Sequence, residues 1–395
     1  MTASTITKRI ESIDILRGLV MVIMALDHVR DYFHKDAFIS DPTNLDTTTP
    51  ELFFTRFITH FCAPTFIFLS GTSAFLYGRN KSKAELSKFL FTRGLWLVFV
   101  EIFIMNFLWW FDPSFGFTNL QVIWAIGFCM ILLSLLIYVP KRILLVLGLL
   151  IVFGHNLLDG FRMEGYSFGA ILWYMFHQGA LIPLNKEFAI DFLYPILPWA
   201  GVMLLGYCFG ELYSKDFDSR LRKKYLLRFG LSALVLFFIL RTFNIYGESN
   251  HWAEQKNLSF SILSFFNVSK YPPSLLFILI TLGPALLFAR WVEPIKNRVT
   301  DILTVFGRVP FFYYVLHVLV IHVAAMIGLE LTGGSWKQMI LTNEVFMEGK
   351  LAGYGYSLLT TYLVWIGIVI LLYFPSKVYM RYKMNNKDKR WLSYL

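Results

Sequence analysis

Residues 9–33 read RIESIDILRGLVMVIMALDHVRDYF, a stretch that is long and apolar enough to cross a bilayer as a helix. It also carries six ionisable side chains after its first turn: Asp14, Arg17, Asp27, His28, Arg30 and Asp31. Such groups are costly in lipid, so their presence indicates a function by default. Arg17 and His28 are eleven positions apart, which returns them to nearly the same helix face, about 16 Å apart along the axis. The stretch therefore predicts a polar stripe with a cation near one membrane surface and an imidazole near the other.

The composition is that of a polytopic membrane protein. The chain has 395 residues, of which 56% are hydrophobic and only 16% are charged, whereas a soluble chain carries about a quarter charged residues. The mean hydropathy is +0.57. We therefore attribute the formal net charge of +10 to cytoplasmic loops and not to nucleic-acid binding. The three cysteines lie in apolar segments without metal-like spacing, so no metal site is predicted.

Apolar stretches of about the length that a bilayer requires predict an all-α protein with ten transmembrane helices. They lie at 13–33, 53–77, 89–111, 120–139, 143–158, 191–212, 225–244, 273–289, 303–328 and 357–375. The apolar stretch 166–184 contains Gly, His, Gln and Pro, and we interpret it as re-entrant or interfacial, with an eleventh span as the alternative. We see no internal repeat and interpret residues 1–395 as one domain with a short tail from about residue 377.

Loop charge orients these helices. Lys and Arg are much more numerous in the loops on the N-terminal side than in the opposite loops. The positive-inside rule then predicts that both termini are cytoplasmic. His28 and Lys270 would lie toward the outer face. Pro64 and Pro310 interrupt predicted spans, which is tolerated only where the freed backbone groups are buried or line a cavity, so they predict an internal cavity.

His28 is the first candidate for chemistry. Asp31 follows it by three positions, so its carboxylate could orient the imidazole as in a general-base pair. Asp27 and Asp31 are one turn apart and could instead bind a cation or substrate. Asp14 and Arg17 could neutralise each other. The alternative for the whole stripe is that its charges only hold the bundle together.

Further candidates lie in other predicted spans. His60 follows Arg56 by one turn and is either a catalytic side chain in the cavity or a core histidine. Arg308 suits an anionic group such as a phosphate, while Tyr313 and His317 lie deeper on one side of the same span. Lys270 could meet a substrate carboxylate, or could only extend its amine to the interface. We interpret four single polar residues as structural: Glu101, His155, His177 and Arg241.

The opening stretch resembles the start of the bacterial membrane-protein family of heparan-α-glucosaminide N-acetyltransferase catalytic-domain-like proteins. The same resemblance extends to four later stretches: FITHFCAPTFIFLSGTSAF (57–75), YPILPWAGVMLLGYCFG (194–210), FNVSKYPPSLLFILITLGPALL (266–287) and FGRVPFFYYVLHVLVIH (306–322). The chain is also more distantly similar to acyltransferase family three, whose first helix carries an Arg-x10-His motif. Arg17 and His28 have that spacing here.

The resemblance implies a multi-pass transferase of the inner (plasma) membrane. It would move an acetyl group from cytoplasmic acetyl-CoA, the acyl donor, to an amine or hydroxyl of a glycan or small sugar at the outer face. His28, Asp31 and His60 would be catalytic. Arg17 and Arg308 would bind the CoA phosphates. Asp27, Lys270, Tyr313 and His317 would contact the substrate. A homodimer is left open.

Two alternatives remain at this point. In the lysosomal heparan enzyme the position matching His28 is Asn and the catalytic His follows the first helix, where this chain has His34; we favour His28. A proton-coupled secondary transporter would also place His and Asp groups within the membrane and break its helices. Two features speak against transport: no two halves share interruptions, and the ionisable groups are concentrated in one helix.

Overall fold

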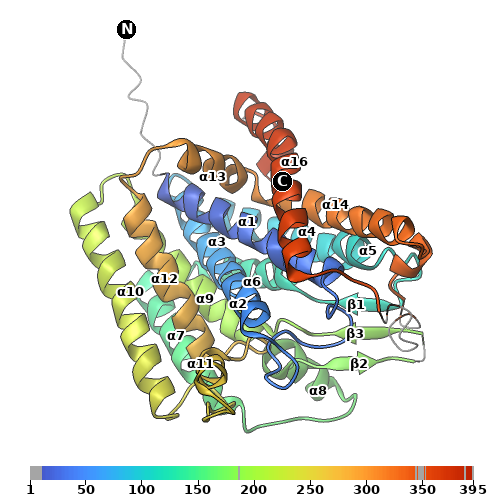
Figure 1. Cartoon of the computed structure of the whole chain (residues 1–395). Helices are drawn as coiled ribbons and strands as arrows, with labels where there is room; N and C mark the ends of the chain where they lie inside the picture. The colour runs from blue at the N-terminus through green and yellow to red at the C-terminus, as the bar shows by residue number, and fades with distance from the viewer. Residues whose placement is uncertain are drawn as a thin grey trace.

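The computed structural model describes residues 11–185, 187–342, 345, 351, 353–386 and 388–393, and helices dominate it (Figure 1). In chain order the α-helices are α1 (Ser12–Phe33), α2 (Pro50–Thr59), α3 (Cys62–Gly78), α4 (Lys83–Phe99), α5 (Asn106–Trp110), α6 (Val122–Leu136), α7 (Lys141–Gly154), α8 (Phe168–Trp173), α9 (Ile196–Phe209), α10 (Ser219–Thr242), α11 (Leu258–Phe266), α12 (Leu275–Val292), α13 (Arg298–Arg308), α14 (Pro310–Leu331) and α16 (Leu358–Asn385). Short 3-10 or π-helical segments continue several of them: η1 (Val100–Met105), η2 (His155–Leu158), η3 (Tyr174–Gln178) and η4 (Gly210–Tyr213). The predicted all-α class is confirmed.

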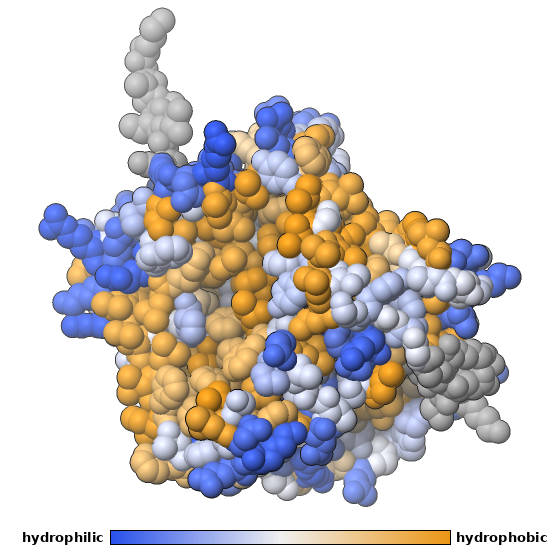
Figure 2. All heavy atoms as spheres, viewed as in Figure 1, coloured by the Kyte–Doolittle hydropathy of each residue, from blue (hydrophilic) through white to orange (hydrophobic). Residues whose placement is uncertain are grey.

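Among the described residues, eight helical segments are long and apolar enough to cross a membrane. They are Pro50–Gly78, Lys83–Trp110, Lys141–Leu158, Ile196–Tyr213, Ser219–Thr242, Leu275–Val292, Pro310–Leu331 and Leu358–Asn385. Figure 2 shows a broad apolar surface on one face, with hydrophilic residues gathered around its edges. The chain is therefore a multi-pass membrane protein.

The ten predicted spans all fall on helices. Eight of them overlap the segments above. The predicted span 120–139 is α6, which is apolar but shorter, and 13–33 is α1, which is long enough but carries five Asp and Arg side chains. The span predicted at 303–328 is not one helix, because α13 ends at Arg308 and α14 begins at Pro310. Proline lacks an N–H and disfavours helical geometry in the residue before it.

The stretch 166–184 forms no membrane-length helix. It folds into α8, η3 and strand β2 (Leu181–Pro183). This strand pairs antiparallel with β3 (Ala189–Asp191), which pairs parallel with β1 (Phe117–Asn119). The small sheet has the order β1-β3-β2 and lies beside α8, near the C-terminal end of α1 (Figure 1).

Helix α1 lies at the centre of the helices and packs against α2, α3, α12, α13, α14 and α16 (Figure 1). Its closest approach is to α13, where two glycines face each other. A Cβ on Gly18 would lie 1.8 Å from the Leu303 carbonyl oxygen, and one on Gly307 would lie 1.7 Å from that of Asp14. Small residues of this kind let membrane helices touch through their backbones. The contact fixes the N-terminal half of α1, including Arg17.

Candidate active site

A cavity of about 310 Å³ lies beside the C-terminal half of α1. Helices α1, α2 and α14 contribute to its wall, together with the segments before α6, α9 and α12. Its acidic, basic and histidine lining residues are Asp27, His28, Asp31, Arg56 and Lys270. The structure therefore brings four predicted site residues to one cavity, and Arg56 joins them.

His28 contacts His317 across the junction of α1 and α14. The two side chains are buried, their nitrogens His28 Nδ1 and His317 Nε2 are 2.7 Å apart, and their rings stack at 4.8 Å. His317 stacks in turn on Tyr313, with ring centroids 5.1 Å apart. Tyr313 and His317 thus support His28 from the side, and the cavity lining does not include them.

Hydrogen bonding assigns the protons of this pair. His317 Nδ1 lies 2.9 Å from the Tyr313 carbonyl oxygen, which can only accept, so Nδ1 carries the proton. A neutral His317 then has its lone pair on Nε2 and accepts from Nδ1–H of His28. The lone pair of His28 is left on Nε2, the nitrogen that a base or nucleophile would use.

The prediction that Asp31 orients His28 is wrong in this structure. Asp31 Oδ1 instead accepts a 2.6 Å hydrogen bond from Arg30. Helical spacing places Asp31 near His28, but the adjacent guanidinium is the better partner for a carboxylate. The positioning partner of His28 is His317.

Asp27 joins two cations beside His28. Its Oδ1 accepts a 2.8 Å hydrogen bond from Arg30, and its Oδ2 accepts one from Arg56 on α2. All three side chains are at least four-fifths buried. A buried carboxylate held by two guanidinium groups keeps its charge and its direction, so it presents a fixed acceptor beside the cavity.

Lys270 reaches the cavity from the segment before α12, as does Tyr271. Its ammonium lies 5.0 Å from the centre of the Tyr271 ring. Burial alone would raise the pKa of Tyr271, but the Lys270 ammonium and the Arg56 guanidinium lower it below its ordinary value. Lys270 and Arg56 therefore add positive charge to a lining that also carries the carboxylates of Asp27 and Asp31.

His60 does not line the cavity. Its buried ring packs between Phe57 and Phe277, with centroids 6.0 and 5.3 Å away. His34, the alternative catalytic histidine, also lies outside the cavity lining. It follows α1, and its Nδ1 accepts a hydrogen bond from the backbone N–H of Asp36. His28 is thus the one histidine of the cavity lining.

A second cavity, of about 860 Å³, lies at the N-terminal end of α1. Its charged lining residues are Asp14, Arg17, Arg79, Lys215 and Arg222. Arg17 donates hydrogen bonds to Ser73 Oγ at 2.9 Å and to the Gly307 carbonyl oxygen at 3.2 Å, and lies 3.5 Å from Asp14 Oδ1. Three of these cations have carboxylate partners: Arg17 has Asp14, Arg79 has Asp216 and Arg222 has Glu293. The wall therefore offers guanidinium donors to an anion without a large net positive charge.

Arg308 does not line the second cavity. Its guanidinium lies 3.5 Å from Asp14 and 3.7 Å from Glu11. Arg17 and Arg308 therefore share Asp14, whereas the sequence suggested only the pairing of Asp14 with Arg17. Of the two predicted phosphate-binding arginines, Arg17 alone faces this cavity.

Sequence reasoning missed several residues of the site. Arg56 was noted only as a neighbour of His60, although an arginine inside an apolar stretch is itself a strong signal. Trp109 packs edge-on to His28 at 4.7 Å, and Tyr314 does so at 6.1 Å. Aromatic residues are abundant in this chain, so no sequence signal separates these two from rings that face lipid.

Fold and site together define a multi-pass membrane protein with a buried histidine pair beside a polar cavity. Residues 9–246 match the family described as heparan-alpha-glucosaminide N-acetyltransferase, catalytic, and the chain belongs to this family of membrane acetyltransferases. No curated protein matches the chain. The matched residues include α1, Asp27, His28 and Arg56. They end before Lys270 and His317, so the resemblance of 266–287 and 306–322 stays a prediction.

Proposed function

We propose that this chain transfers an acetyl group from cytoplasmic acetyl-CoA to an amine or hydroxyl of a sugar at the outer face of the inner (plasma) membrane. The observation that carries the proposal is the His28–His317 pair, in which His28 lines the cavity and His317 holds it from behind. When Nδ1–H of a buried imidazole already donates a hydrogen bond, the lone pair on Nε2 is the group that is left for chemistry. That group is what acyl transfer to an amine or hydroxyl requires.

Two routes use this lone pair. In direct transfer, His28 Nε2 takes the proton of the acceptor N–H or O–H while the acceptor attacks the thioester carbonyl, and the CoA thiol leaves with a proton. In the covalent route, Nε2 itself attacks the thioester and CoA leaves as a thiolate. The acceptor then attacks the acetyl-imidazolium, its proton passes to the thiolate, and Nε2 is released with its lone pair. His317 accepts from Nδ1–H in both routes and stabilises positive charge that develops on the His28 ring.

The second cavity supports the donor side of the proposal. It is the larger of the two, and its guanidinium groups suit the phosphates of CoA. Arg17 and His28 lie on one continuous helix, about 16 Å apart along its axis. CoA is itself elongated, with its phosphates at one end and its thioester at the end of the pantetheine arm. A single acetyl-CoA molecule would therefore need a phosphate site and a thioester site that are well separated along α1.

The first cavity supports a sugar as the acceptor. Its wall combines rings, among them Trp109, Tyr194 and Tyr314, with the carboxylates of Asp27 and Asp31. Aromatic faces pack against the C–H faces of sugar rings, and carboxylates accept hydrogen bonds from sugar hydroxyls or from an amine. Lys270 would attract an acceptor that also carries an acidic group.

The proposal is tested with detergent-purified protein and with inverted membrane vesicles. Acetyl-CoA and CoA should each raise the melting temperature, and dephospho-CoA should raise it less, because it lacks the 3′-phosphate that the guanidinium groups would hold. Radiolabelled acetyl-CoA added outside inverted vesicles should label a sugar-containing acceptor inside. Stabilisation by none of the three compounds, together with no labelling, would contradict the proposal and favour transport.

A further inference from the structure

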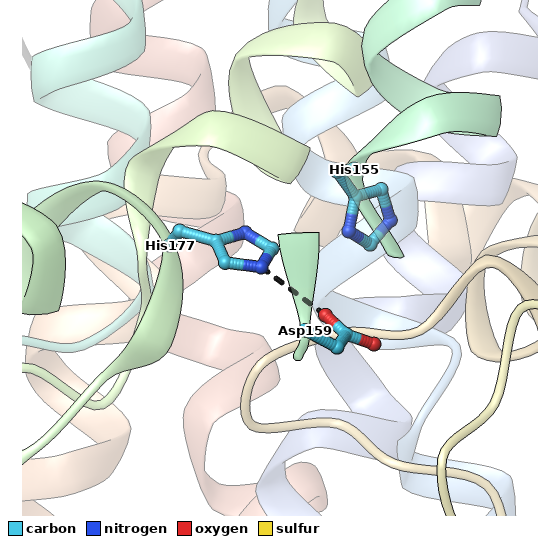
Figure 3. A group of neighbouring side chains, drawn as sticks. All are labelled: His155, Asp159 and His177. Atoms are coloured by element: carbon cyan, nitrogen blue, oxygen red, sulfur yellow. Dashed lines mark hydrogen bonds and ion pairs between the residues drawn. The ribbon is translucent and has the colours of Figure 1, made fainter. Parts of the chain in front are cut away.

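Two histidines and one aspartate meet where α7 ends, away from both cavities described above. His155 begins η2, Asp159 follows η2, and His177 lies on η3 (Figure 3). Donor atoms of the three side chains, one from each, lie within 4.8 Å of one another. Figure 3 shows the two imidazoles on either side of the Asp159 carboxylate, with His177 Nε2 3.1 Å from Asp159 Oδ1.

Both imidazoles have buried nitrogens without a partner. His155 is 2% exposed, and neither its Nδ1 nor its Nε2 makes a hydrogen bond. His177 is equally buried, and its Nδ1 has no partner either. Leaving a buried polar group unsatisfied costs about 1–3 kcal/mol. An imidazole with both nitrogens unsatisfied is therefore expensive unless something absent from the protein chain binds it.

The carboxylate is already oriented for a ligand. Asp159 Oδ2 accepts a 2.8 Å hydrogen bond from the Asn156 side-chain amide, while Oδ1 faces His177. Asn156 is itself fixed, because its Oδ1 accepts from the backbone N–H of Leu275 at the start of α12. Ligating carboxylates in metal sites are held in this way by a second layer of hydrogen bonds.

We propose that His155, Asp159 and His177 bind a divalent transition-metal ion of the Zn²⁺ type. Two imidazoles and one carboxylate are ligands that Zn²⁺ prefers, whereas Mg²⁺ and Ca²⁺ prefer oxygen ligands alone. Ligands at about 2.0–2.1 Å from a tetrahedral ion are about 3.3 Å apart. The His177–Asp159 pair already has this spacing, and only His155 must move closer, by a side-chain adjustment.

The site has room for a further ligand. A cavity of about 270 Å³ is lined by Asp159 and His177, and Gln178 and Ser269 also contribute to its wall. Water from this cavity would complete the coordination. Tyr271 lines both this cavity and the one beside His28. The ion would thus fasten the end of α7 to η3 next to the segment that carries Lys270, independently of the acetyl-transfer proposal.

The test uses the full chain in detergent, purified without a polyhistidine tag and treated with a chelator. Addition of Zn²⁺ should restore one ion per chain by elemental analysis and raise the melting temperature, and Mg²⁺ should do neither. Co²⁺ should produce the visible absorption of a tetrahedral or five-coordinate site. Wild-type protein that retains no stoichiometric Zn²⁺ and shows no Co²⁺ absorption would overturn the proposal.

Variants locate the ion. Asp159→Asn and His155→Ala should each weaken Zn²⁺ binding at least tenfold and abolish the Co²⁺ absorption, and Asn156→Ala should weaken binding by about 10–100-fold through the second layer. His251→Ala is the matched control, because His251 is exposed and outside the cluster, and should bind as the wild type does. Unchanged binding in Asp159→Asn and His155→Ala would overturn the assignment. If either variant fails to fold, the wild-type metal content and absorption decide the question.

Discussion

His28 Nδ1 lies 2.7 Å from His317 Nε2, so the first helix and α14 meet through two imidazoles at the wall of one cavity. The Tyr313 carbonyl oxygen fixes the proton on the far side of His317, which makes His317 an acceptor toward His28. The chain of three groups orients His28 with its Nε2 lone pair free. Relative to His28, His317 occupies the position that the carboxylate holds in a Ser-His-Asp triad.

Replacement of His317 tests its role as the positioning residue. His317→Ala should lower the rate of acetyl transfer by about 10–100-fold, because His28 loses the acceptor that fixes its ring and proton. His317→Gln retains an oxygen that can accept from Nδ1–H and should recover part of the loss. Transfer of radiolabel from acetyl-CoA measures both. Equal rates for His317→Ala and His317→Gln would argue against a hydrogen-bonding role.

Removing Asp27 should destabilise the protein strongly. Asp27→Ala leaves Arg56 buried without its carboxylate, whereas Arg30 keeps Asp31, and breaking a buried ion pair in this way costs about 3–5 kcal/mol. The exposed Arg79–Asp216 pair is the control, since 86% of the Asp216 side chain is exposed and Asp216→Ala should cost less than about 1 kcal/mol. Melting temperatures of the purified variants measure the difference. Similar losses in the two variants would contradict the burial argument.

The contact between α1 and α13 should not tolerate a methyl group. Gly307→Ala places a Cβ 1.7 Å from the Asp14 carbonyl oxygen, so the two helices must separate, at a cost of about 1–3 kcal/mol or more. Gly367→Ala is the control within α16, where a Cβ would have no neighbour within 4 Å. That change should be neutral or stabilising, by up to about 1 kcal/mol. Thermal unfolding compares them, and a neutral Gly307→Ala would show that the helices are not in contact there.

Arg17 should determine how well the donor binds. Arg17→Lys keeps the charge but loses the planar guanidinium, so the affinity for acetyl-CoA should fall. The ratio of the affinity for CoA to the affinity for dephospho-CoA should also become smaller. Arg290→Ala removes an exposed cation outside the second cavity and should leave both unchanged. Titration calorimetry measures the affinities. An unaltered preference in Arg17→Lys would exclude Arg17 from phosphate binding.

Much of the fold could be predicted because hydrophobic length is a local property. Each predicted span falls on helix, and the interruption at Pro310 follows from proline itself. Partners across the bundle could not be predicted in this way. Spacing within α1 made Asp31 the apparent partner of His28, whereas the actual partner, His317, comes from a helix near the other end of the chain.

Spacing along the chain does not reveal contacts between helices, and this also explains why other predicted residues lie elsewhere in the structure. Arg308 has the charge and the position along its helix that a phosphate would require, but packing turns it toward Asp14 and Glu11. His155 and His177 looked like isolated structural histidines because the fold, and not the spacing, brings them to Asp159. Lys270 lines the cavity beside His28, and its contact with a substrate stays a prediction.

The most direct test of the account is the rate of acetyl transfer by His28→Ala. Radiolabelled acetyl-CoA and inverted vesicles are used, and acetyl-CoA binding is followed by thermal shift on the same preparation. The variant should bind acetyl-CoA as the wild type does, because Arg17 and the second cavity are unchanged, and should transfer acetyl about 10²–10⁴-fold more slowly. Transfer at the wild-type rate would contradict the assignment of His28 as the catalytic residue.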